Sequence, residues 1–302
     1  MGKKRRREKE RAAKAAAKAA KAEKRGGNKG GNKGGNKGGN KGGGKRAKGP
    51  AMVEGIPMPG RKSRDPFYQT IMPIQLELLK LQGQLKEDGE KMLVIVEGPS
   101  AAGKNALVER FMEFMMPRGV RATTIQPPNE VEAGQWYMQR FMNNLPVAGE
   151  FAFMIGSWYT RAWAETVSGG CTEAEADAFL NYIPAFERYL MDSGVKIFKI
   201  WLNISQEEQG IRLKELNSSD LLHWKMSQLD CDDPSKYDDH IAAKEKMVER
   251  TSTPAAPWIT VNGDDEKAAQ INAIQYFVSQ FNYPEKKGGL LEYNTDVVFP
   301  AS

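Results

Sequence analysis

The sequence predicts an α/β protein in which a parallel sheet is covered by helices on both faces. Short apolar runs alternate with helix-like segments from about residue 65 to residue 280. Such regular alternation is typical of parallel strands joined by helices. The apolar run 92–97 also passes into a glycine-bounded turn and then into a helix. In sheets of this class, ligands bind at the carboxyl ends of the strands, where this turn lies.

Each element follows from the spacing of apolar residues. Apolar side chains at helical spacing predict a first helix that begins near Asp65 and ends at Gly89. A charged stretch then interrupts the pattern after residue 216. The remaining elements are expected as strand 92–97, helix 104–116, strand 121–125, helix 130–144, strand 151–155, helix 175–192, strand 196–202, helix 205–216, strand 258–261 and helix 264–280.

The turn after the strand 92–97 has the composition of a phosphate-binding loop of the Walker A type. Its glycines and lysine have the spacing of a loop whose backbone N–H groups and lysine surround phosphates ahead of a helix N-terminus. Asn105 stands where such loops usually have Ser or Thr. The residues expected to bind phosphate here are Gly98, Ala101, Ala102, Gly103, Lys104 and Asn105. The alternative is a strand, turn and helix with tight glycines and no ligand.

Charge divides the chain into a basic tail and an acidic body. Residues 1–50 carry 19 Lys and Arg against 3 Asp and Glu, whereas the whole chain has a net charge of +6. The other 252 residues therefore carry a net charge of −10. Four copies of Gly-Gly-Asn-Lys over residues 26–41 predict disorder, because this composition buries too little apolar surface to fold. The tail is either an arm that binds polyanions or a solubilising extension; an organelle transit peptide is a third alternative.

These patterns predict one folded domain over residues 65–285, preceded by a linker at 51–64 and followed by a C-terminal extension at 286–302. Cys171 and Cys231 provide neither a disulfide framework nor a metal-ligand pattern. The chain has no apolar run of about 18 residues and no secretory apolar region, so we expect a cytoplasmic protein without a membrane span.

Further motifs carry a resemblance to a known family. They are Val96–Lys104, Pro117-Arg118-Gly119, Gln135–Arg140, Ser157–Ala162, Trp224–Ser227, Tyr237-Asp238-Asp239 and Thr251–Trp258. In this order they resemble the polyphosphate kinase type 2 family, over about residues 65–285. The resemblance implies a P-loop kinase fold with a helical lid at about 205–250. It further implies phosphate transfer between inorganic polyphosphate and a nucleoside mono- or diphosphate, with Mg²⁺, in a homo-oligomer.

The resemblance also assigns roles to basic side chains. Lys104, Arg118 and Arg161 are expected to contact phosphates as catalytic residues, since phosphoryl transfer depends on positioned cations. Arg140 is a further candidate for phosphate binding, and either faces the site or packs with its helix. Arg212, Lys214 and Lys225 would belong to a lid that closes over a long anion. The alternative for each of these lid residues is an ordinary charged helix face.

Two positions depart from the family pattern. Ser100 and Ile155 stand where the family has aspartates that would hold Mg²⁺ and activate the acceptor. Glu97 and Glu150 are the carboxylates that could compensate. Mg²⁺ prefers carboxylate oxygens, so the departures favour reduced or altered activity. The alternatives are a catalytically degenerate polyphosphate- or nucleotide-binding protein anchored by its basic tail, and an ATP-dependent kinase for a small molecule.

Overall fold

The computed structural model describes residues 52–53, 56–57, 65–218 and 234–301. All of the described elements belong to one compact unit, Gly49–Ser302. The predicted disordered tail, most of the linker, Lys225 and the middle of the predicted lid lie outside the described residues.

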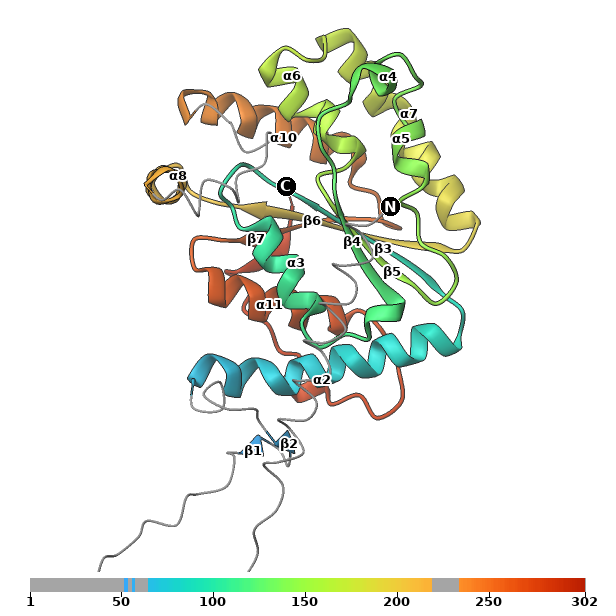
Figure 1. Cartoon of the computed structure of the whole chain (residues 1–302), viewed down its shortest axis with the longest axis vertical. Helices are drawn as coiled ribbons and strands as arrows, with labels where there is room; N and C mark the ends of the chain where they lie inside the picture. The colour runs from blue at the N-terminus through green and yellow to red at the C-terminus, as the bar shows by residue number, and fades with distance from the viewer. Residues whose placement is uncertain (1–51, 54–55, 58–64, 219–233, 302) are drawn as a thin grey trace, which may run out of the picture. The chain divides into compact units, whose positions relative to one another are not determined.

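A six-stranded sheet forms the centre of the fold (Figure 1). Its order is β4 (Val120–Thr124), β5 (Phe151–Ile155), β3 (Lys91–Glu97), β6 (Val195–Asn203), β7 (Trp258–Asn262) and β8 (Val298–Pro300). All neighbouring strands pair in parallel except β8, which is antiparallel to β7. Val96 pairs with Ile155 and with Ile200, so the carboxyl ends of β3, β5 and β6 meet at one edge. The predicted fold class is confirmed.

Helices cover both faces of this sheet. Successive residues of β3 point to opposite faces: Val94 and Val96 pack in one layer, and Leu93 and Ile95 in the other. The first layer includes α2 (Pro66–Glu87), α3 (Lys104–Met112) and α11 (Glu266–Ser279). The second includes α5 (Gln139–Met142), α7 (Glu173–Asp192) and α10 (Tyr237–Thr251). Figure 1 shows α2 and α11 on one side of the sheet and α7 and α10 on the other.

Several elements differ from their prediction. The helix expected at 130–144 is two short helices, α4 (Glu130–Ala133) and α5; α4 begins at a capping box of Asn129 and Glu132 and ends at its C-cap, Gly134. The helix after the loop stops at Met112, ahead of Pro117 and the 3-10 helix Pro117–Gly119.

The helices α6 (Ala164–Ser168) and α10 and the strand β8 were not predicted. The strand β8 lies within the expected C-terminal extension. The predicted lid region begins as α8 (Gln206–Asn217), whereas α10 buries Met247 and Val248 in the core of the body. Within the described part of the chain, every helix is too short or too polar to cross a bilayer. A short antiparallel pair, β1 (Met52–Val53) and β2 (Ile56–Pro57), precedes α2.

Candidate phosphate-binding site

The predicted loop joins β3 to α3 at the carboxyl edge of the sheet. Gly98 has a φ of 148° and Gly103, the residue before α3, has a φ of 97°. Both values favour glycine. A Cβ atom at Gly98 would lie 2.3 Å from the backbone oxygen of Leu202 on β6, so the loop runs directly against the neighbouring strand. The loop therefore presents the N-terminus of α3, whose first N–H groups have no partner within the helix, to the space above the sheet.

Lys104 lies at the start of α3 and folds back over the loop. Its Nζ donates to the backbone oxygens of Gly98 at 2.7 Å and of Pro99 at 2.9 Å. These two carbonyls hold the ammonium group at the mouth of the loop. A phosphate at the helix N-terminus would meet this positive charge together with the backbone N–H groups.

Arg212 on α8 fixes the other side of the loop. Its Nη1 donates to the backbone oxygen of Ala101 at 3.3 Å, and its Nη2 donates to the oxygens of Gly263 at 2.7 Å and Asp264 at 2.9 Å. Nearby, Nε2 of Gln209 donates to the backbone oxygen of Ser100 at 3.1 Å. The predicted lid residue Arg212 thus connects the middle of α8 to the loop and to the turn after β7.

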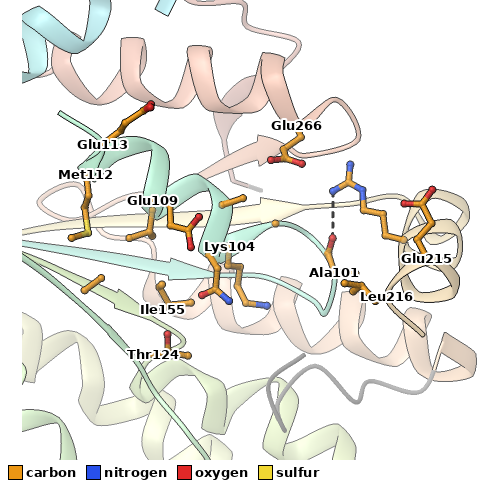
Figure 2. A pocket seen from close by; sticks show the side chains of 16 residues that line it. Ala101, Lys104, Glu109, Met112, Glu113, Thr124, Ile155, Glu215, Leu216 and Glu266 are labelled. Atoms are coloured by element: carbon orange, nitrogen blue, oxygen red, sulfur yellow. Dashed lines mark hydrogen bonds between the residues drawn. The ribbon is translucent and has the colours of Figure 1, made fainter. Parts of the chain in front are cut away.

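A cleft of about 990 Å³ opens beside the loop. Figure 2 shows Lys104 and Glu109 on α3 near Ile155 at the end of β5. The predicted residues Ala101, Gly103, Lys104, Asn105, Ile155 and Arg212 line this cleft. The structure therefore brings most of the predicted loop to one cavity. Lys214 is exposed on α8 and lies outside its lining.

Arg118 and Glu150 lie at the opposite edge of the sheet. Arg118 precedes β4 and Glu150 precedes β5, whereas the loop follows β3, and all three strands are parallel. Glu150 accepts from Nε of Arg121 at 2.8 Å and from the backbone N–H of Val147 at 2.9 Å. The structure thus corrects both expectations. Both residues are next to a strand in the sequence, as expected. Each precedes its strand, however, and so lies at the amino end, away from the loop.

Arg161 and Arg140 are held by other contacts. Arg161 follows β5 and lies over the ring of Tyr137 at 4.6 Å, with Nη2 3.3 Å from Oε1 of Glu175. Arg140 donates to the backbone oxygen of Gln126 and lies 3.8 Å from Glu132. Neither arginine lines the cleft beside the loop. A role for either in phosphate contact stays a prediction.

Glu97 ends β3 immediately before the loop and is fully buried. It accepts from Oγ of Ser157 at 2.5 Å and from Nε1 of Trp163 at 3.1 Å. Burial raises the pKa of Glu97, and the hydrogen bonds from Ser157 and Trp163 oppose this effect. Glu97 therefore links the loop strand to the turn after β5. Sequence reasoning missed Ser157 and Trp163 as its partners; the signal was an acidic residue within an apolar strand.

The donor set does not fit a carboxylate-bound Mg²⁺. Ser100 is 1% exposed, and Ile155, at 6%, presents a hydrocarbon to the cleft. The carboxyl group of Glu97 already accepts hydrogen bonds from Ser157, Trp163 and, at 3.5 Å, Oγ1 of Thr160. Among the described residues, no three His, Cys, Asp or Glu side chains are grouped so that they could hold a metal ion. We therefore derive no step of the reaction through Mg²⁺.

Comparison with known proteins gives a consistent result. The family described as polyphosphate kinase 2 matches residues 61–289. A GDP-polyphosphate phosphotransferase of Pseudomonas aeruginosa is 41% identical over 226 residues, which are 75% of this chain and 63% of that protein. An NDP-polyphosphate phosphotransferase of Ruegeria pomeroyi is 40% identical over 76% of this chain and 67% of its own length. An ADP-polyphosphate phosphotransferase of Pseudomonas aeruginosa is 37% identical over 75% of each chain.

Solved structures agree with the sequence comparison. The crystal structure of polyphosphate kinase 2 from Arthrobacter aurescens superposes with a TM-score of 0.67 at 26% identity, and covers 78% of this chain and 88% of that one. The motifs, the fold and the relatives lead to one conclusion: the chain belongs to the polyphosphate kinase 2 family.

Proposed function

We propose that the protein transfers phosphoryl groups between inorganic polyphosphate and a nucleoside mono- or diphosphate. The observation that carries this proposal is the loop at the carboxyl edge of the sheet, with Lys104 at its mouth and a cleft of about 990 Å³ beside it. Relatives that are 37–41% identical are named as phosphotransferases of polyphosphate with GDP, ADP or NDP.

The residues act mainly by placing charge. Phosphoryl transfer needs positioned donors more than it needs covalent chemistry by the protein. Lys104 exchanges its contacts with the oxygens of Gly98 and Pro99 for phosphate oxygens, and charge-assisted hydrogen bonds of this kind are stronger than neutral ones. The hydrogen bond from Arg212 to the backbone oxygen of Ala101 stabilises the conformation of the loop. We expect slow turnover, because Ser100 and Ile155 provide no carboxylate at the two expected positions.

Product formation by the full chain tests this proposal. Polyphosphate, Mg²⁺ or Mn²⁺ and one of AMP, ADP, GMP or GDP are incubated with the protein, and phosphorylated nucleotide is measured. We expect product from at least one acceptor, and its loss in Lys104→Met. Lys91→Met is the matched control. Lys91 is the first residue of β3, the strand that leads into the loop, so it lies at the opposite edge of the sheet, and it donates to the backbone oxygen of Ser193. The absence of product with all four acceptors would refute the proposal.

A second candidate is a binding protein without turnover. The hydrocarbon of Ile155 in the cleft favours it. It predicts saturable nucleotide or polyphosphate binding that Lys104→Met weakens, without product. A chain without residues 1–50 tests the proposed anchoring by the basic tail, since loss of phosphate contacts by that segment would lower the salt dependence of polyphosphate affinity. The homo-oligomer expected from the resemblance is a further proposal, measurable by sedimentation.

A further inference from the structure

Helix α7 carries a stripe of apolar and aromatic residues on the side that faces away from the core. Its buried residues, such as Phe179 and Ile183, pack in the second layer. On the opposite side, the stripe residues recur at every third or fourth position, which places them on one face of the helix. In the described part of the chain, all members of this exposed stripe are accessible to solvent: Ala174, Ala178, Tyr182, Ala185 and Tyr189. A helix face that meets only water is ordinarily polar or charged, so the stripe indicates a contact with another molecule.

Two large aromatic side chains project from the exposed stripe. Tyr182 is 36% exposed and Tyr189 is 70% exposed. Tyrosine is enriched at protein–protein interfaces, because its ring buries apolar area while its hydroxyl keeps a hydrogen bond. The three alanines of the stripe are small, so a second helix can approach closely between the tyrosines. The stripe therefore has the projections and recesses that a helix-to-helix contact requires.

The order of large and small residues in the stripe fits a second copy of α7 in antiparallel orientation. Homodimers are most often related by a twofold axis, which brings the same surface of both subunits together. An antiparallel pair centred on the stripe sets Ala178 against Ala185 of the partner subunit, with Tyr182 beside the axis. In the same register, Tyr189 projects over Ala174 of the partner subunit. A parallel pair would instead set both tyrosines against their own copies and hold the helices apart there.

The antiparallel register also supplies a polar contact at each end of the pair. Glu175 lies beside the stripe, on the flank of the tyrosines, so its carboxylate approaches the hydroxyl of Tyr189 of the partner subunit. The side chain of Glu175 is 53% exposed, accepts from Oγ1 of Thr172 at 2.8 Å and lies 3.3 Å from Arg161. A carboxylate has about four acceptor positions, so it can also accept from a tyrosine hydroxyl. Because the axis is twofold, this contact forms twice.

We propose that α7 is a dimerisation surface, at which two copies of the chain pair through the exposed stripe, antiparallel about a twofold axis near Tyr182. The proposal assigns a surface to the oligomer expected from the resemblance, and it does not depend on the proposed activity. The stripe spans residues 174–189, about 24 Å of helix. A single helix pair of this length buries less than the roughly 1,600 Å² of a typical stable interface, so we expect a dissociation constant in the micromolar range.

Sedimentation velocity of the full chain over a range of concentrations tests the proposal. We expect the wild type to pass from monomer to dimer as the concentration rises. Ala178→Glu and Ala185→Lys each place an unpaired charge in the contact, and each should raise the dissociation constant at least about tenfold. Thr70→Glu is the matched control and should leave the constant unchanged, because Thr70 is exposed on α2, in the layer on the other face of the sheet.

A double variant tests the antiparallel register directly. Ala178→Glu with Ala185→Lys in one chain places each carboxylate opposite an ammonium group of the partner subunit. Within one chain the two positions lie about 10 Å apart along the helix, so recovery of the dimer reports pairing between chains. We expect the double variant to return the dissociation constant to within about threefold of the wild-type value, since neither charge is then unpaired.

The outcomes separate this inference from the proposed function. A concentration-dependent dimer that both single variants weaken and the double variant restores supports the inference, whether or not the protein phosphorylates a nucleotide. A wild type that stays monomeric up to about 100 μM overturns it. A dimer that neither single variant weakens would lie on another surface and also overturns it. A double variant as weak as the single variants rejects the antiparallel pairing.

Discussion

The loop at 98–104 and the turn at 155–163 lie at the same edge of the sheet but differ in what holds them. The loop depends on backbone geometry, since Gly98 and Gly103 have positive φ values and Gly98 lies against β6, and side chains of α8 bind only its backbone oxygens. The turn begins at Gly156, whose φ is also positive, but its own side chains bind a buried carboxylate: Ser157 and Trp163 donate to Glu97, and Ile155 faces the cleft. Loss of the expected carboxylates therefore leaves the loop intact. We therefore expect phosphate binding and catalytic rate to be separable in this molecule.

The largest effect is expected where backbone geometry of the loop is broken. Gly98→Ala places a Cβ atom 2.3 Å from the oxygen of Leu202 and gives alanine a φ that it rarely adopts. We expect at least about 3 kcal/mol of lost stability and loss of nucleotide binding. Gly83→Ala in α2 is the control, because nothing lies within 4 Å of the added atom and alanine favours helices by about 1 kcal/mol. Equal stability of the two variants in chemical denaturation would contradict this account of the loop.

The second effect concerns the buried polar side chains that pack against the turn at 155–163. Tyr159 donates to Oε1 of Glu187 at 2.7 Å, and the buried Nζ of Lys199 donates to Oε2 of Glu187 at 2.8 Å and to the backbone oxygen of Thr251 at 2.8 Å. Lys199→Met leaves the carboxylate of Glu187 buried without its cation. We expect a loss of about 3–5 kcal/mol in the free energy of unfolding. Nucleotide affinity should stay unchanged under conditions where the variant is folded.

The matched control for this pair removes both charges. Lys199→Met with Glu187→Leu should recover a large part of the lost stability, since no buried charge is left unpaired. A double variant as unstable as Lys199→Met alone would show that packing around Tyr159 and Trp258, rather than the charge pair, determines the effect.

The third prediction restores the missing carboxylates. The double variant Ser100→Asp with Ile155→Asp introduces aspartates at the two positions where the family has them, one within the loop and one at the start of the turn. We expect kcat with polyphosphate, nucleotide and Mg²⁺ to rise at least tenfold, which corresponds to about 1.4 kcal/mol of transition-state stabilisation. Ile155→Asn introduces a polar group of similar size without charge and serves as the control. An unchanged kcat in the double variant would mean that other parts of the site also limit the reaction.

The sequence predicted the loop and its sheet well, and the side-chain contacts poorly. Apolar runs and paired glycines are local signals, so the strands and the turn at Gly98–Lys104 could be located. Arg118 and Glu150 were misplaced because nearness to a strand was considered without its direction: both residues precede a parallel strand in the chain, so both lie at the amino edge, opposite the loop. The partners of Arg212 and Arg161 could not be predicted, since they come from segments distant in the chain. The helix α10 was missed because its polar face hides a narrow buried stripe at His240, Met247, Val248 and Thr251.

The smallest expected effect is a dependence of stability on pH. It arises at Glu97, which links the loop to the turn. Burial raises the pKa of Glu97 above its ordinary value of 4.5. The folded state therefore retains a proton that the unfolded state has already released. The contribution of Glu97 to stability is fully present below pH 4.5 and is lost as the pH rises through the higher pKa of the folded state. Glu97→Gln keeps an acceptor for Ser157 and Trp163 but binds no proton. Both proteins are denatured at a series of pH values from below 4.5 upwards. The free energy of unfolding of the wild type should fall relative to that of Glu97→Gln as the pH rises. A difference independent of pH would mean that folding does not change the protonation of Glu97.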